Sequence, residues 1–390
     1  MCEKLKLRDG LCCHCKDGRK YKNELNTLLQ TLHQDCSTCK KDETCPKYQT
    51  FSSEKKLKIQ DLKEKIEKFS EHEKLYQHQE KQYDNDIEQL KVDECIVVQD
   101  FSSKFHTVDT INQSQMEWFN LNTTNDLVLT LITKLTDDKL KYQYFNYFSE
   151  DKNDSLYVKC AWMQFIEDIN LNSFKKVIIW SDGGPKHFKC AKNLYFFSTL
   201  FNSKVVYNFF ASCHGKGPCD SHLGVIKRRL KEFLLEKDIT SVEDIINVVK
   251  LQPNSNGVEI EIDPTLNHKV TKLPEGIKKY HNFTFENTGV IKCNLLTNDS
   301  EEPTIQRLAK IPDEYGENDV KYVCIGVDES TEEEIWELVE VKKQVDNDGN
   351  KKVRKCGNCK QPGHTQSKCK APCSFCGSVQ HVVNKCNAPK

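Results

Sequence analysis

Three short segments of this sequence lead to an aspartate, and together they could form a metal-dependent catalytic site. Asp100 ends the run CIVVQD, Asp182 follows VIIWS, and Asp220 comes after VVYNFF and a Gly-rich loop. Runs rich in β-branched and aromatic residues are typical of buried parallel strands, whose carboxyl ends carry the sites of open α/β sheets. Carboxylates that converge there repel one another unless cations lie between them. The pattern therefore predicts divalent metal binding and phosphodiester chemistry.

Mg²⁺ or Mn²⁺ is the expected catalytic cofactor, because hard cations prefer oxygen ligands and leave positions open for phosphate. Taken singly, each aspartate also fits a turn or a helix cap, so the prediction depends on their joint placement. Glu232 and Glu236 are alternatives for the third acid on the helix predicted after Asp220. Both lie several turns along that helix, far from the strand ends, so we favour Asp220.

The loop CHGKGPC before Asp220 is a second candidate for chemistry. Its glycines, Gly215 and Gly217, allow the backbone to approach a phosphate closely. Basic residues near the acids could contact a DNA backbone, although a solvated face or plain loop structure is an alternative. The predicted nucleic-acid contacts are His214, Lys216, Lys186, Lys227 and Arg228. A zinc clip is a further alternative, formed by His187, Cys190, His214 and Cys219.

Alternation of strand-like and helical patterns is strong over residues 92–240. The predicted strands are 94–101, 127–134, 142–148, 175–180 and 204–211, and the predicted helices are 155–170, 187–200 and 220–236. The order is three strands, then helix, strand, helix, strand and helix. This order matches the ribonuclease-H-like fold, in which a meander precedes the α/β crossovers. The fold carries its acids at the places of Asp100, Asp182 and Asp220. We therefore predict an α/β chain with a ribonuclease-H-like mixed-sheet core.

The segments around this core have different compositions. Apolar residues recur with helical spacing over 54–91, which predicts one long helix that lies along the core or pairs with an N-terminal helix, with homodimerisation as an alternative. Residues 241–345 contain short strand-like runs separated by Pro, Asn and acidic clusters, which predict a small β-rich appendage. Residues 346–355 have the composition of a linker.

Two copies of the spacing C-x2-C-x4-H-x4-C occupy the tail, 356–386. Their ligands are Cys356, Cys359, His364 and Cys369 in the first copy and Cys373, Cys376, His381 and Cys386 in the second. Each copy is too short to fold without its ion, so structural zinc is expected. Such zinc knuckles commonly bind unpaired bases of single-stranded RNA or DNA. Aromatic residues are few in this tail, so protein binding is the alternative.

A further zinc site is predicted in the Cys-rich segment 1–50. Its expected ligands are Cys12, Cys15, Cys36 and Cys39, in two C-x-x-C pairs. Four competing ligands leave this set open: Cys13, His14, His33 and Cys45.

Composition limits the setting in which these sites would work. The 390-residue chain has a net charge of −1, so any attraction to DNA must be local. Its 20 cysteines cluster as metal-site pairs, and neither a signal peptide nor a membrane span is apparent. We therefore expect an intracellular, reducing compartment, the nucleus, with DNA as partner and no membrane.

At the three aspartates the sequence resembles a large group of transposase-derived proteins of eukaryotic genomes. The shared segments are DFS at Asp100, SDGGPKHFK at Asp182 and HGKGPCD ending at Asp220, and the resemblance covers about 70–240. It implies a D-D-D/E transposase core of ribonuclease-H type, which would act as a metal-dependent polynucleotidyl transferase. The alternative is a domesticated, catalytically silent protein that retains zinc-dependent nucleic-acid binding. The tandem knuckles rest on their spacing, not on the resemblance.

Overall fold

A computed structural model describes residues 12–32, 48, 51–102, 104–106, 123–200, 204–212, 214–215, 217–272, 276–298, 300–315, 320–327 and 334–340. The chain forms two compact units, 1–313 and 314–390. None of the described helices combines the length and apolar character needed to cross a membrane.

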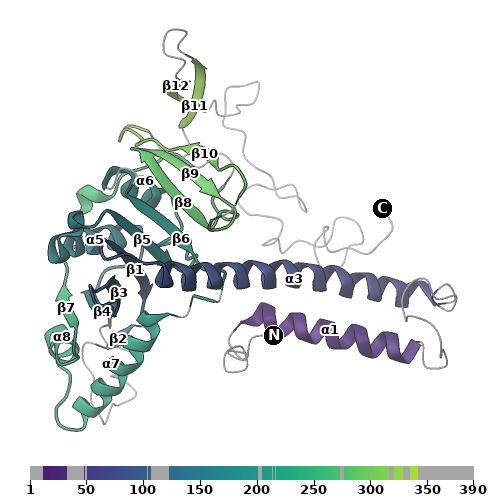
Figure 1. Ribbon diagram of the computed structural model, residues 1–390, viewed down its shortest axis with the longest axis horizontal. Helices are drawn as coiled ribbons and strands as arrows, with labels where there is room; N and C mark the ends of the chain where they lie inside the picture. Colours follow the sequence, from purple (N-terminus) through teal and green to yellow (C-terminus); the bar gives the residue numbers. More distant parts are fainter. Residues whose placement is uncertain are drawn as a thin grey trace, which may run out of the picture. The chain divides into compact units, whose positions relative to one another are not determined.

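Two N-terminal helices, α1 (Cys13–Leu32) and α3 (Ser53–Glu88), lie side by side (Figure 1). Ser52 caps α3 by accepting a hydrogen bond from the backbone N–H of Lys55. Gly18 of α1 lies directly against the Phe69 ring, where any side chain would collide with it. The predicted helix over 54–91 is confirmed, and so is its pairing with an N-terminal helix.

A large mixed sheet forms the centre of the first unit. Its central strands are β1 (Glu94–Phe101), β3 (Thr123–Lys134), β4 (Leu140–Ser149), β5 (Lys176–Ser181) and β6 (Val205–Phe209). These run in the order β6-β5-β1-β3-β4, with β1, β5 and β6 parallel and β3 antiparallel to both β1 and β4. The chain is therefore a mixed α/β protein, as predicted.

Helices cover both faces of this sheet. One buried cluster joins β1, β3 and β5 to α5 (Ser155–Ile169) and α6 (Ala191–Leu200). The other joins the opposite side chains of the same strands to α7 (Pro218–Leu234), α8 (Val242–Lys250) and the end of α3. Because strand side chains alternate between faces, the near-continuous apolar runs supply both cores. Short 3₁₀ turns occur at Leu171–Ser173 and Pro264–Leu266.

Segment 241–345 differs from the predicted appendage, because most of its strands extend the main sheet. β7 (Ser255–Glu259) pairs with β4 at one end, and β8 (Asn282–Asn287), β9 (Val290–Asn294) and β10 (Thr304–Arg307) continue from β6 at the other. The short β2 (Phe105–His106) pairs with β3. Without these strands β4 and β6 would present unpaired edges, which folded proteins avoid. A separate hairpin, β11 (Val320–Val327) and β12 (Glu334–Glu340), belongs to the second unit.

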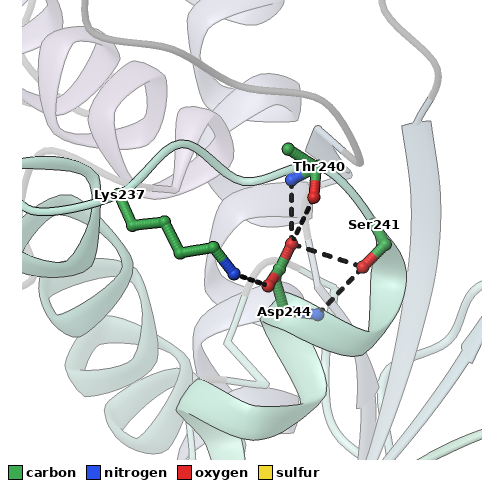
Figure 2. A network of polar contacts seen from close by, with 4 residues as sticks. All are labelled: Lys237, Thr240, Ser241 and Asp244. Carbon is green, nitrogen blue, oxygen red and sulfur yellow. Dashed lines mark hydrogen bonds and ion pairs between the residues drawn. The ribbon is translucent and has the colours of Figure 1, made fainter.

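The connection from α7 to α8 is fixed by one carboxylate (Figure 2). Asp244 accepts hydrogen bonds from the backbone N–H and hydroxyl of Thr240, at 2.9 and 2.8 Å, and from the Lys237 ammonium at 2.8 Å. Ser241 accepts from the Asp244 backbone N–H and caps α8. These contacts hold the two helices that cover the α7 face of the sheet.

Candidate functional site

The three predicted acids come from three neighbouring element ends. Gln99 of β1 is in register with Ser181, the last residue of the parallel β5. The next residue along each chain segment is an acid, Asp100 in β1 and Asp182 directly after β5. Asp220 lies in the first turn of α7. The strands and the helix start therefore deliver the acids to one region.

The acids also share one face of the sheet. Val98 of β1 and Trp180 of β5 belong to the cluster under α7. Since side chains alternate along a strand, Asp100, two residues beyond Val98, is directed to the same side. Asp182 directly follows β5, and a side chain at Gly215, in the loop before α7, would begin 3.4 Å from its Cβ. Asp220 begins the helix that covers this side.

Electrostatics shows that the carboxylates are close enough to interact. Burial, as the largest cause, and the negative charges of Asp182 and Asp220 together raise the pKa of Asp100 from 3.8 to about 8. The backbone N–H of Phe101 acts against this shift. A divalent cation between the acids would reverse the repulsion, which is the arrangement expected of a carboxylate metal site.

The loop between β6 and α7 lies against all three element ends. A side chain at Gly215 would begin 3.4 Å from the Asp182 Cβ, and one at Gly217 would begin 3.6 Å from a Val98 methyl. The backbone N–H of Gly217 donates to the Asp220 carboxylate at 3.1 Å. This loop therefore helps to position the acids. Its sequence had suggested a different role, contact with phosphate.

Asp182 additionally shapes its own turn by accepting the backbone N–H of Gly184 at 3.0 Å. That contact fits the simple turn interpretation of Ser-Asp-Gly-Gly and leaves the second carboxylate oxygen for other ligands. The neighbouring His187 is within electrostatic reach: burial lowers its pKa, and the charge of Asp182 opposes that change.

Two buried side chains, which the sequence did not single out as anchors, fix α7 on the sheet. The Cys219 thiol donates to the Val98 carbonyl and lies 3.2 Å from the Thr130 hydroxyl. His222 is hydrogen bonded to Asn146 at 2.8 Å. Cys219 and His222 are three residues apart, so both lie on the buried side of α7. They precede and follow Asp220 in sequence, and this helical spacing is the feature from which their anchoring role could have been predicted.

A second constellation brings together Cys12, Cys15, His72 and His214, which we call the Cys/His cluster. Its four ligand atoms all lie within 4.8 Å of one another. The Cys12 sulfur is 3.5 Å from Nε2 of His72, the Cys15 sulfur is 3.4 Å from Nε2 of His214, and the two Nε2 atoms are 3.1 Å apart. Such a set of two sulfurs and two imidazole nitrogens is compatible with zinc.

The cluster contains two of the four ligands that the sequence predicts for the N-terminal zinc site. Cys12 and Cys15 are joined by His72 of α3 and by His214, whereas the predicted partners Cys36 and Cys39 lie outside the described residues. Burial and the Cys12 sulfur raise the pKa of the Cys15 thiol to about 12. Only a bound cation would favour its thiolate at neutral pH, as metal ligation requires.

The cluster also corrects the role of His214. The sequence suggested a phosphate contact, but its ring is directed to the sulfurs and stacks on Tyr76, with ring centroids 4.1 Å apart. The alternative clip through Cys219 is wrong as well, because that thiol is hydrogen bonded to β1 and β3. The partners of His214 in the cluster are distant from it in sequence.

The remaining predicted contacts are only partly described. Lys186 and Arg228 are exposed, and the half-buried Lys227 ammonium lies 6.0 Å from the centre of the Phe105 ring. Lys216 lies outside the described residues, as do all eight ligands predicted in the tail, 356–386.

Comparison with protein families matches residues 79–297 to the Domain of unknown function (DUF8701), more than half of the 390 residues. The chain belongs to this family. The DUF8701 match begins at Gln79 and ends at Thr297, and these two residues meet in the interior: the Gln79 side chain donates to the Thr297 hydroxyl and accepts its backbone N–H. The match includes the three acids and His214 but not the other members of the Cys/His cluster. No curated protein matches the chain.

Proposed function

We propose that the protein cleaves DNA strands and transfers them, as transposases do, through a two-metal site on Asp100, Asp182 and Asp220. The observation that carries the proposal is the placement of the three acids, near the end of β1, directly after the parallel β5 and in the first turn of α7. Asp182 and Asp220 lie within electrostatic reach of Asp100, and their charges raise its pKa. Divalent cations would offset the repulsion within such a set.

The strand order supports a ribonuclease-H-like core. An antiparallel meander, β1-β3-β4, is followed by β5 and β6, which join on the other side of β1 through α5 and α6. The first acid ends β1, the second follows β5, and the third lies on the helix after β6. This is the arrangement that the resemblance to transposase-derived proteins implies.

Mg²⁺ or Mn²⁺ would supply Lewis acidity at the scissile phosphate. The three carboxylates would hold and orient the ions. In the first step water attacks the phosphodiester and a 3′-hydroxyl leaves; in the second that 3′-hydroxyl attacks a phosphodiester of target DNA and displaces another 3′-oxygen. The protein contributes positioning and charge neutralisation, not covalent chemistry.

Nucleic-acid binding would come from other parts of the chain. We propose that the two CCHC motifs of 356–386 bind zinc and single-stranded RNA or DNA, and that exposed Lys186 and Arg228 contact the DNA backbone. Activities of this kind on DNA would be carried out in the nucleus.

The test is a nicking assay on supercoiled plasmid and a strand-transfer assay with DNA ends that carry free 3′-hydroxyls, both in Mg²⁺. Asp182→Ala should lower both rates by at least about 100-fold, the scale on which removal of one preorganised electrostatic group acts. Asp137→Ala, which changes an exposed aspartate in the turn between β3 and β4, is the matched control and should retain full activity.

Metal rescue separates a ligand role from a structural one. Asp182→Cys should be inactive with Mg²⁺ and recover in part with Mn²⁺, because a thiolate is a poor ligand for the harder ion. Equal nicking by wild type and Asp182→Ala would refute the catalytic site. DNA binding with no nicking by either protein would support the catalytically silent alternative.

A further inference from the structure

The Cys/His cluster joins three segments that are far apart in sequence. Cys12 and Cys15 lie at the start of α1, His72 lies in α3, and His214 lies in the loop before α7. Cys12 and Cys15 are buried, with 4% and 9% of their surface exposed. No disulfide links the two thiols, and both cysteines are free.

The Cys12–His72, Cys15–His214 and His72–His214 distances agree with edges of a tetrahedron around zinc. With Zn–S of about 2.3 Å and Zn–N of about 2.0 Å, a sulfur and a nitrogen should be about 3.5 Å apart and two nitrogens about 3.3 Å apart. The observed sulfur–nitrogen distances are 3.5 and 3.4 Å, and the nitrogen–nitrogen distance is 3.1 Å. The same ring atom, Nε2, is presented by both histidines.

Proton sharing explains this arrangement less well than a metal ion does. Between two neutral imidazoles only one Nε2 can donate to the other, and each must also satisfy a sulfur. A zinc ion accepts all four lone pairs at once, and two thiolates neutralise its charge, which suits a buried position. Binding releases the two thiol protons to solvent.

We propose that Cys12, Cys15, His72 and His214 bind one zinc ion that fixes the loop between β6 and α7. The ligand set of two sulfurs and two imidazoles favours zinc over the oxygen-seeking ions expected at the aspartates. The zinc ion connects α1 and α3 to this loop, so these two helices help to hold the loop beside the three acids. Zinc binding does not depend on the proposed strand cleavage.

The loop carries this constraint to the acids over a few residues. Gly215, which follows the ligand His214, packs against Asp182, and the backbone N–H of Gly217 donates to Asp220. On the other side, Tyr76 stacks on the His214 ring one helical turn from His72. Without the ion, His214 is no longer connected to Cys15 through zinc. The loop then loses a contact that holds it next to Asp182 and Asp220.

The first experiment counts zinc in the full-length protein after dialysis, by mass spectrometry of the metal. Cys15→Ser and His72→Ala should each contain one zinc equivalent less than wild type, while any zinc at the C-terminal motifs is common to all. Cys160→Ser is the matched control, because Cys160 is also buried but lies in α5 outside the cluster. In Co²⁺-substituted protein, the same two variants should lose part of the thiolate charge-transfer absorption.

The second experiment measures amide hydrogen exchange over 211–220, with circular dichroism to verify that each variant is folded. Cys15→Ser should exchange faster at Gly215 and Gly217 than Cys160→Ser does. Unchanged zinc content in Cys15→Ser and His72→Ala would overturn the site, and loss of zinc without faster exchange would overturn its role as a tether. If wild type and Asp182→Ala both contain the zinc but neither cleaves DNA, the proposed function fails and the zinc site stands.

Discussion

The substitution Asp100→Asn should stabilise the metal-free protein, because the surroundings of the wild-type carboxyl disfavour its charged form. Its pKa is 3.8 in ordinary surroundings and about 8 in the fold. The folded state therefore binds the proton more tightly, and the contribution of Asp100 to stability is fully present below pH 3.8 and is lost as the pH rises to about 8.

The magnitude follows from the same values. Each tenfold difference in proton affinity is worth about 1.4 kcal/mol, and pH 7 lies roughly three such steps above 3.8, which gives an upper limit of about 4 kcal/mol. Asp100 is half-buried by accessible surface, so we expect about 2 kcal/mol. In EDTA at pH 7, Asp100→Asn should therefore raise the unfolding midpoint by about 4–8 °C.

Differential scanning calorimetry in EDTA and in Mg²⁺, between pH 4 and pH 8, is the assay. Mg²⁺ binds the folded wild type and should stabilise it by about 2.7 kcal/mol at a hundred times its dissociation constant, whereas Asp100→Asn should gain much less. The advantage of the variant in EDTA should grow with pH.

Asp126→Asn is the matched control for this prediction. Burial raises the pKa of Asp126 to about 8 as well, but Asn146 and Lys227 are its polar neighbours in place of other acids. This variant should leave the response to Mg²⁺ unchanged. An Asp100→Asn protein that is less stable than wild type in EDTA at pH 8 would refute the reasoning.

Two further predictions concern the supports of the fold. Gln79→Leu should lower the free energy of unfolding by about 2–4 kcal/mol, because it leaves the buried backbone N–H of Thr297 without its partner; denaturation by urea measures it. Gln82→Leu is the control: its side chain accepts an exposed hydrogen bond from Asn298, and its loss should change the free energy by less than about 0.5 kcal/mol. Asp244→Ala should cost about 1–2 kcal/mol at pH 7, with Glu243→Ala as the exposed control. Hydrogen bonds from Lys237 and Thr240 hold the pKa of Asp244 below 3.8. Its contribution to the free energy of unfolding is therefore present above pH 3.8 and is lost as the pH falls below that value. If the stability lost in Asp244→Ala is the same at pH 2 as at pH 7, this reasoning is contradicted.

The sequence predicted the central elements well because their patterns are local. The run ending at Asp100 and the run before Asp182 are buried on both faces, and only strands of a covered sheet combine such length and composition. The helix over 54–91 was equally clear, since its apolar spacing extends over many turns.

Non-local pairing could not be derived in the same way. The strands around Phe283 and Val258 look like those of a small separate sheet, and nothing in their sequence states that they pair with β6 and β4. The Cys/His cluster shows the same limit: Cys12 has a local partner in Cys15, but only folding brings His72 and His214 to them. Contacts over such separations depend on the whole topology.

The meeting of Gln79 and Thr297 has a consequence for how the DUF8701 domain relates to its host chain. The chain therefore enters and leaves the matched region at nearly one point, so the segments before Gln79 and after Thr297 begin close to each other. Both flanks nevertheless remain part of the same unit, because α3 continues through Gln79 and β10 adds a strand to the sheet after Thr297. The N-terminal flank also brings Cys12 and Cys15 to His214 of the matched region.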